Sequence, residues 1–333
     1  MTRIIADFYN CRMKIVLACP APVGSRSGNR VTAKRWARIL KSLGHRVVIE
    51  QHYDGRPVDL LVALHARRSF AAIAKYRKCF PQGPLVVALT GTDLYRDIHT
   101  SRRAERSLEW ADLLIVLQPC GRDEVPAHLR PKVRVLFQST TPVKHVPATN
   151  SESFDVCVLG HLRHVKDPFR AALALRLLPS TSKARVLNAG KALSEAMARR
   201  ARALMKREPR YRWLGELGHA QARRLLANSR LLVVSSRMEG GANVVSEAVV
   251  DGVPVLASRI GGNVGLLGAR YPGFFPVGDT AALARLIERA ETDAAFYERL
   301  KRDCERQKLL FDPRREQADW EALLNEFVAI KRA

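Results

Sequence analysis

Short apolar runs alternate along this chain with longer stretches of helical spacing, and this alternation constrains the fold more than any other feature. The first run covers residues 13–18 and precedes a Pro-, Gly- and Ser-containing loop at 20–29. Apolar side chains then recur at helical spacing over 36–43, before another short run at 47–49. A strand, a helix and a second strand in this order form the unit from which parallel sheets are built.

The alternation continues in two series separated by a polar segment. Further strands are expected at 60–64, 85–89, 113–117 and 133–137, and then at 154–159, 184–188, 231–235 and 254–257. Residues 138–153 form the linker, and helices are expected at 168–178 and 194–207. We therefore predict two doubly wound α/β domains with ligands bound in a cleft at the carboxyl ends of the strands.

The expected domain boundaries follow from the linker. One domain covers 13–142 and the other 154–311, with a last helix over 313–330 that could pack back on the first. Asp312 and Pro313 are typical of a helix start, and Trp320, Leu323, Leu324, Phe327 and Val328 form an apolar stripe after them. Residues 1–12 fit no element and are expected to be an N-terminal extension.

The charge balance requires anionic partners. The chain has 56 Lys and Arg against 32 Asp and Glu, for a net charge of +24. Nucleic acid, anionic lipid and phosphorylated small molecules all remain possible partners at this point. Only 7% of the residues are aromatic and no basic–aromatic stacking motif occurs, so nucleic-acid binding is a remote alternative. No Cys-x-x-Cys pair and no apolar run of about 20 residues is present, which predicts a cytoplasmic protein without an integral membrane segment.

A Gly- and Arg-rich loop follows the first strand. It contains Gly24, Arg26, Gly28 and Arg30 and leads into a helix. Backbone N–H groups at a helix start, close-approaching glycines and guanidinium groups together bind anions. The loop matches neither a dinucleotide-binding nor a Walker sequence, and a plain connecting loop explains it nearly as well.

Polar side chains follow the strands at 60–64 and 85–89. His65 and Arg67 come after the former, and Thr92 and Asp93 after the latter. His65 could orient an acceptor, remove its proton or bind a phosphate, although a lone histidine is more often structural.

The most informative stretch is residues 235–248, which runs from a strand through a glycine turn into a helix. Glu239 and Glu247 lie eight positions apart, with Gly240, Gly241 and Asn243 between them. A carboxylate on the first turns of the helix can accept both vicinal hydroxyls of a ribose, while the helix N-terminus faces a diphosphate. Acidic residues on a solvent-exposed helix face are the alternative explanation.

These residues, with Gly252-x-Pro254-Val255 and Gly261-Gly262, resemble the nucleotide-sugar half of GT-B glycosyltransferases with the Glu-x7-Glu motif. The segment 160–168 is similar to the diphosphate-binding loop of that family, with Lys166 at the position of its lysine. Two positions depart from the pattern. His161 stands where arginine is usual, so Arg163 is expected to supply the cation, and Gly265 replaces an acid.

A narrower resemblance spans most of the chain. Residues 22–30, 63–69, 89–95 and 271–276 are similar to the selenosugar synthases of selenoneine biosynthesis. This resemblance implies a GT-B fold, with an acceptor-side first domain and a nucleotide-sugar-binding second domain. It also implies transfer of N-acetylglucosamine from UDP-N-acetylglucosamine to selenophosphate, with no cofactor and no essential metal. A general GT-B transferase that acts on a hydroxyl of a glycan or lipid is the alternative.

The resemblance and the motifs together assign the site residues. The donor-binding residues are Gly24, His161, Arg163, Lys166, Glu239, Gly240, Gly241, Asn243 and Glu247. The acceptor-binding residues are Arg26, Arg30, Arg67 and Thr92, and the catalytic residues are His65, Asp93 and Glu239.

Overall fold

The computed structural model describes residues 12–144 and 152–330 of the 333-residue chain. The expected extension at residues 1–12 lies outside this description except for Arg12, as does the middle of the expected linker. The chain divides into two compact units. Unit 1 comprises residues 1–138 and 313–333, and unit 2 comprises residues 139–312.

Unit 1 contains one six-stranded sheet in which all paired strands are parallel, in the order β2-β1-β3-β4-β5-β6. Its elements are β1 (Lys14–Ala18), α2 (Gly28–Ser42), β2 (Arg46–Glu50), β3 (Leu60–Leu64), α3 (Phe70–Cys79), β4 (Leu85–Leu89), η1 (Asp93–Asp97), α4 (Ile98–Thr100), α5 (Arg102–Trp110), β5 (Leu113–Val116), α6 (Gly121–Glu124), η2 (Ala127–Lys132), β6 (Val133–Val135) and α14 (Pro313–Ile330).

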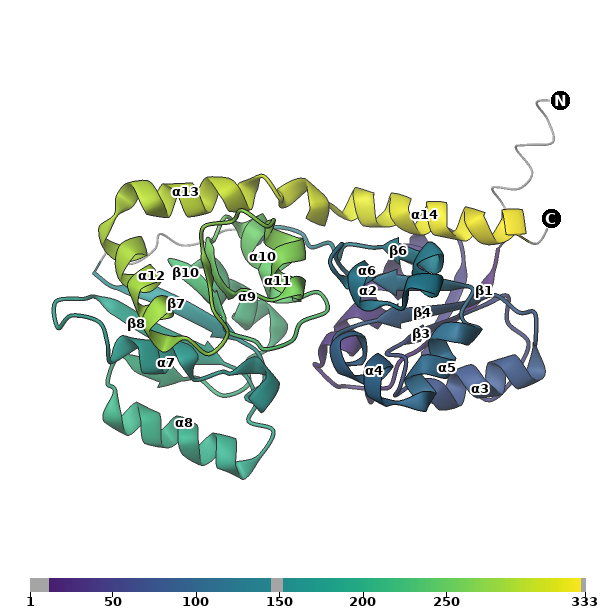
Figure 1. The fold of residues 1–333 in the computed structure, drawn as a ribbon, viewed down its shortest axis with the longest axis horizontal. Helices are drawn as coiled ribbons and strands as arrows, with labels where there is room; N and C mark the ends of the chain where they lie inside the picture. Colours follow the sequence, from purple (N-terminus) through teal and green to yellow (C-terminus); the bar gives the residue numbers. More distant parts are fainter. Residues whose placement is uncertain (1–11, 145–151, 331–333) are drawn as a thin grey trace. The chain divides into compact units, whose positions relative to one another are not determined.

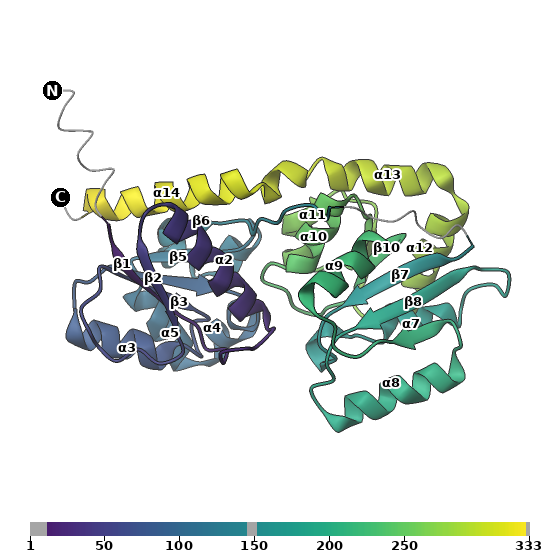
Figure 2. The ribbon, with the colours of Figure 1, turned by 180° about the vertical axis from the view of Figure 1, so that it is seen from behind.

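Both faces of this sheet are buried, because helices pack on each of them. Successive side chains of each strand point to opposite faces and therefore enter both cores. Ile15 and Leu17 of β1 pack on one face with side chains of α2 and α14. Val16 and Ala18 pack on the other with side chains of α3 and α5 (Figures 1 and 2). Continuous apolar strands are therefore the pattern that this fold requires.

The last helix belongs to the core of unit 1. Trp320 is fully buried and meets Trp36 of α2 edge to face at 5.0 Å between ring centroids, and Trp36 Nε1 donates a hydrogen bond of 2.9 Å to Glu316. Leu323, Leu324 and Phe327 are buried beside them, as the spacing predicted, while the side chain of Val328 lies outside the described part.

Unit 2 contains a second sheet of six parallel strands, in the order β12-β11-β10-β7-β8-β9. Its elements are β7 (Phe154–Leu159), η3 (His164–Lys166), α7 (Arg170–Leu175), β8 (Ala184–Ala189), α8 (Glu195–Arg207), β9 (Tyr211–Trp213), α9 (His219–Ala227), β10 (Leu231–Val234), α10 (Asn243–Asp251), β11 (Val255–Ser258), α11 (Gly261–Leu267), β12 (Phe274–Phe275), α12 (Thr280–Thr292), α13 (Ala294–Glu305) and η4 (Lys308–Phe311).

The two sheets confirm the prediction of two doubly wound α/β folds. The helix expected over 168–178 is shorter and covers Arg170–Leu175. The strands β9 and β12 were not expected, because edge strands of three and two residues leave no apolar run in the sequence.

Candidate functional site

In a doubly wound sheet, ligands bind beyond the carboxyl ends of the two neighbouring strands from which the chain winds in opposite directions. In unit 2 these strands are β7 and β10, paired through Leu231 and Val156. The loops that follow them are residues 160–167 and 235–242. Every donor-binding residue predicted in unit 2, except Asn243 and Glu247 on α10, lies in one of these two loops.

The two loops are joined by a charged pair. Lys166 Nζ hydrogen-bonds Glu239 Oε1, and Ser236 Oγ donates to the same oxygen at 2.5 Å. The backbone N–H of Arg237 also donates to the carbonyl oxygen of Val165 at 2.8 Å. Glu239, predicted as both catalytic and donor-binding, is buried and fixes the position of the lysine ammonium group.

A glycine permits this packing. A Cβ atom on Gly262, at the start of α11, would lie 1.9 Å from the carbonyl oxygen of Glu239. No side chain fits at that distance, so Gly262 lets the backbone of α11 approach the Glu239 loop. This is the physical reason for Gly262, the second glycine of the Gly261-Gly262 pair.

Helix α10 begins directly after Gly240 and Gly241, with Ala242 as its N-cap and no side-chain cap hydrogen bond. Asn243 is its first residue, and Glu247 follows one turn later with 14% of its side chain exposed. A helix start without a side-chain cap presents its N–H groups and its positive dipole end to an anion.

The surroundings of His161 favour its uncharged form. Burial lowers the pKa of its imidazole, and the cations Arg163, Lys166 and Lys191 reinforce the shift, although Glu216 opposes it. Its Nδ1 has no hydrogen-bond partner within the described residues. An uncharged imidazole does not supply the positive charge of an arginine, and Arg163 and Lys191 are cations near it. The sequence reasoning missed Lys191, although it lies just beyond the end of β8.

In unit 1 the chain reverses its direction of winding between β1 and β3. His65 follows β3 in the left-handed conformation (φ 75°) and is only 2% exposed. The backbone N–H of Arg68 donates to its Nδ1 at 3.4 Å, and its Nε2 lies 3.3 Å from Thr92 Oγ1. Burial lowers the pKa of His65, although Asp93 and Asp97 oppose the shift. The neutral ring thus uses Nδ1 as the acceptor and carries its proton on Nε2.

Asp93, predicted as catalytic, is fully buried and hydrogen-bonds backbone N–H groups. Its carboxylate accepts hydrogen bonds from the N–H groups of Ala66, Thr90 and Gly91 at 2.8–3.0 Å. These bonds tie the loop after β3 to the loop after β4. The carboxylate accordingly positions the loops and is not presented to a ligand.

The arginines of unit 1 differ in their partners. Arg67 Nε donates to Asp97 Oδ2 at 2.8 Å. Arg30, in the first turn of α2, is 7% exposed, and its Nε and Nη1 have no hydrogen-bond partner in the described part of the chain. Arg26 is exposed in the loop before it, where Gly24 adopts a positive φ of 85°. Gly24, predicted to bind the donor, lies in the same loop of unit 1 as Arg26.

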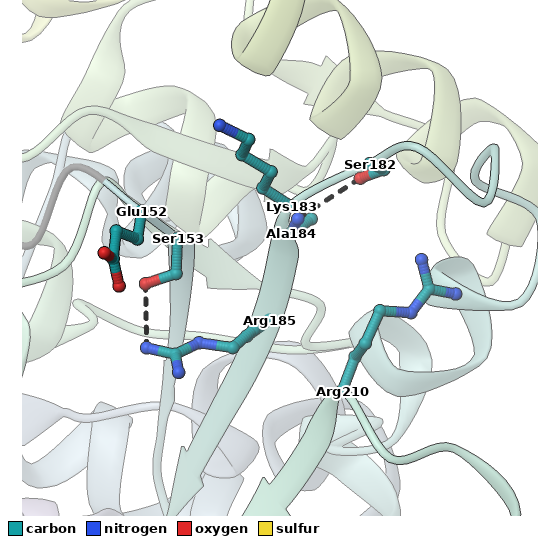
Figure 3. A pocket seen from close by; sticks show the side chains of 7 residues that line it. All are labelled: Glu152, Ser153, Ser182, Lys183, Ala184, Arg185 and Arg210. Carbon is teal, nitrogen blue, oxygen red and sulfur yellow. Dashed lines mark hydrogen bonds between the residues drawn. The ribbon is translucent and has the colours of Figure 1, made fainter.

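A pocket lies at the amino ends of the strands of the unit 2 sheet, opposite the carboxyl ends where ligands are expected (Figure 3). It has a volume of about 330 Å³ and is lined by residues next to the starts of β7, β8 and β9, among them Lys183, Arg185 and Arg210. Arg185 is paired with Asp155 and Arg210 with Glu208. Its arginines are thus already neutralised, and it lies away from the ligand-binding edge.

Residues 12–144 and 152–330 contain neither a candidate metal site nor a candidate membrane span. No group of three or more His, Cys, Asp or Glu side chains there is placed to hold a metal ion. No helix of that part is long and apolar enough to span a membrane.

Comparison with known proteins identifies the family. The family described as glycosyl transferases group 1 matches residues 141–307, half of the chain, and this range contains Lys166, Glu239 and Glu247. The chain belongs to this family of glycosyltransferases.

Solved structures with the GT-B fold match most of the chain. Anabaena HepE in complex with UDP and glucose is 17% identical, with a TM-score of 0.76 over 95% of this chain and 100% of that one. Sucrose-phosphate synthase from Thermosynechococcus elongatus is 18% identical, with a TM-score of 0.73 over 96% and 100%. The pneumococcal O-GlcNAc transferase GtfA, in complex with UDP and GlcNAc, is 13% identical, with a TM-score of 0.62 over 81% and 57%. At these identities the likeness establishes the fold.

Proposed function

We propose that this glycosyltransferase moves N-acetylglucosamine from UDP-N-acetylglucosamine to selenophosphate, as a selenosugar synthase of selenoneine biosynthesis. A UDP-sugar donor is supported by the family, by the Glu-x7-Glu geometry and by the UDP bound in structures of similar fold. The acceptor rests on the sequence resemblance and on how the charged groups of unit 1 are used.

The donor's diphosphate would be held at the end of β7 and the start of α10. Lys166 has three N–H donors, so its bond to Glu239 leaves two for phosphate oxygens. Arg163 and the uncapped start of α10 add positive charge. As the bond to the sugar breaks, negative charge accumulates on this diphosphate, and stabilising such charge is usually the largest catalytic contribution. Glu247 would accept the ribose hydroxyls.

One observation carries the acceptor assignment: the candidate bases on the unit 1 loops are already occupied. Asp93 accepts three backbone hydrogen bonds, and His65 carries its proton on Nε2 while Nδ1 accepts from Arg68. Although burial alone would raise it, hydrogen bonds from Arg96 and Arg67 keep the pKa of Asp97 below its ordinary value. A hydroxyl acceptor needs a base, whereas an anionic nucleophile needs cations.

Selenophosphate is an anionic nucleophile, so it needs cations and no base. Its selenium supplies the electron pair that forms the bond to the anomeric carbon of the sugar. The bond from that carbon to the UDP oxygen breaks, and its electron pair stays on UDP. No proton is removed from the acceptor. Arg30, Arg26 and Arg67 would neutralise its phosphate group, with Thr92 and the Nε2–H of His65 as hydrogen-bond donors.

The direct test is incubation of the protein with UDP-N-acetylglucosamine and selenophosphate, followed by mass spectrometry. We expect a product in which the sugar is joined through selenium to the phosphate group, with one UDP for each sugar transferred, and no sugar product with orthophosphate. Turnover with a hydroxyl acceptor and none with selenophosphate would instead establish the general transferase. Absence of UDP binding, with binding of duplex DNA, would overturn both.

A further inference from the structure

His219, which no motif of the sequence singled out, contacts the carboxylate assigned to the ribose. It is the first residue of α9, and α9 packs against α10 within unit 2. Its Nε2 lies 3.2 Å from Glu247 Oε1. The imidazole is 68% exposed, whereas the Glu247 side chain is 14% exposed. The contact thus lies at the rim of the proposed nucleotide site.

The chemistry of the contact fixes its direction. A carboxylate without a proton only accepts hydrogen bonds, so the Nε2 of His219 carries a hydrogen and donates it to Oε1. A glutamate side chain has three rotatable bonds, and this contact restricts them before any ligand binds. The two carboxylate oxygens offer about four lone-pair sites, so the histidine leaves enough for two hydroxyl donors.

We infer that His219 is a positioning residue that holds Glu247 ready to accept both hydroxyls of a ribose, so that the pair selects ribonucleotides over 2′-deoxyribonucleotides. This inference rests on the proposed role of Glu247. His219 acts through Glu247 and need not touch the nucleotide. Its loss would lower affinity because part of the binding energy would be spent on ordering the freed carboxylate.

The experiment is titration calorimetry of UDP and 2′-deoxy-UDP with four proteins: the wild type, His219→Ala, His219→Gln and Glu247→Ala. For His219→Ala we expect about fivefold weaker UDP binding, the scale of one hydrogen bond to a charged group at a partly exposed site. His219→Gln should recover most of the affinity, since the glutamine amide nitrogen can reach the place of Nε2. The change for 2′-deoxy-UDP should be less than twofold.

The double variant His219→Ala/Glu247→Ala should bind UDP no more weakly than Glu247→Ala, because His219 acts through that carboxylate. His99→Ala is a matched control, since it removes another exposed histidine beside a glutamate, Glu124. Unchanged UDP affinity in His219→Ala, or equal losses for UDP and 2′-deoxy-UDP, would overturn the inference. If the wild type itself failed to bind UDP, the proposed function would fail and the inference with it.

Discussion

The carboxyl edges of the two sheets obey the same topological rule but use their charged side chains differently. In unit 2, each of two glutamates has a basic side chain from another element as its partner: Lys166 for Glu239 and His219 for Glu247. In unit 1, the acids are used internally, by backbone N–H groups for Asp93 and by arginines for Asp97. The Arg30 guanidinium is left with two nitrogens unpartnered in the described residues.

This difference matches two different tasks. A paired cation is positioned in advance and gives one of its bonds to a fixed neighbour, which suits a diphosphate that must be held in a single geometry. A buried cation without a carboxylate partner carries a standing cost of desolvation, which an anionic ligand can offset. These are the charge arrangements that the proposed function requires, with an anionic acceptor at unit 1 and a nucleotide at unit 2.

The largest effect is expected from Lys166→Met, which removes the paired cation of unit 2. We expect kcat/KM to fall by about 10²–10³-fold, the range found when one group that stabilises developing charge is lost. Steady-state kinetics with the UDP-sugar measures it. Lys183→Met is the matched control, because Lys183 lines the pocket at the opposite edge of the same sheet. Similar losses in both variants would contradict the assignment.

Replacement of Arg30 by methionine should separate binding from stability. We expect the KM for the acceptor to rise about 10- to 100-fold, while UDP affinity is unchanged, because one charge-assisted contact is worth roughly 1.5–3 kcal/mol. Since two buried nitrogens are removed, the melting temperature should stay the same or rise. Kinetics and thermal unfolding together test this. A loss of UDP affinity would place Arg30 at the donor.

Acidification should weaken unit 1 through His65. Because its folded-state pKa lies below the ordinary value of about 6.5, the unfolded chain binds more protons as the pH falls. The stability is thus fully present above that pH and declines below it, by at most about 1.4 kcal/mol per pH unit for one group. His65→Asn should flatten this decline, since asparagine tolerates the left-handed backbone.

Urea unfolding at about pH 7.5 and about pH 5.5, roughly one unit on either side of the ordinary histidine pKa, measures this decline. The control is His128→Asn, which replaces a histidine with 66% of its side chain exposed. An equal pH dependence in the wild type and His65→Asn would show that the buried imidazole is not responsible.

The smallest effect is expected from metal removal. If the cations of unit 2 neutralise the diphosphate unaided, turnover in excess EDTA should equal turnover in excess Mg²⁺. Initial rates in both buffers provide the measurement. A rate that depends on Mg²⁺ would mean that Lys166 and Arg163 are insufficient.

The sequence predicted the strands of both units closely, because buried parallel strands are short, continuous apolar runs. The range 85–89 became β4 and 154–159 became β7, with unchanged bounds. The loops that carry candidate site residues could be predicted from these strands, since the loops after parallel strands meet at one edge of the sheet. Edge strands such as β9 escaped prediction because Tyr211–Trp213 alternates apolar and charged side chains.

The sequence by itself thus determined which residues lie at the ends of the strands, because short-range patterns encode strands, helix starts and glycine turns. Only the tertiary structure decided which of those side chains are available. Asp93 is adjacent to Thr92 in sequence, yet its carboxylate already accepts hydrogen bonds from backbone N–H groups of two loops. His219 and Glu247 are 28 positions apart and meet because α9 packs on α10. Hydrogen-bond partners depend on distances between elements, and packing of the whole unit sets those distances.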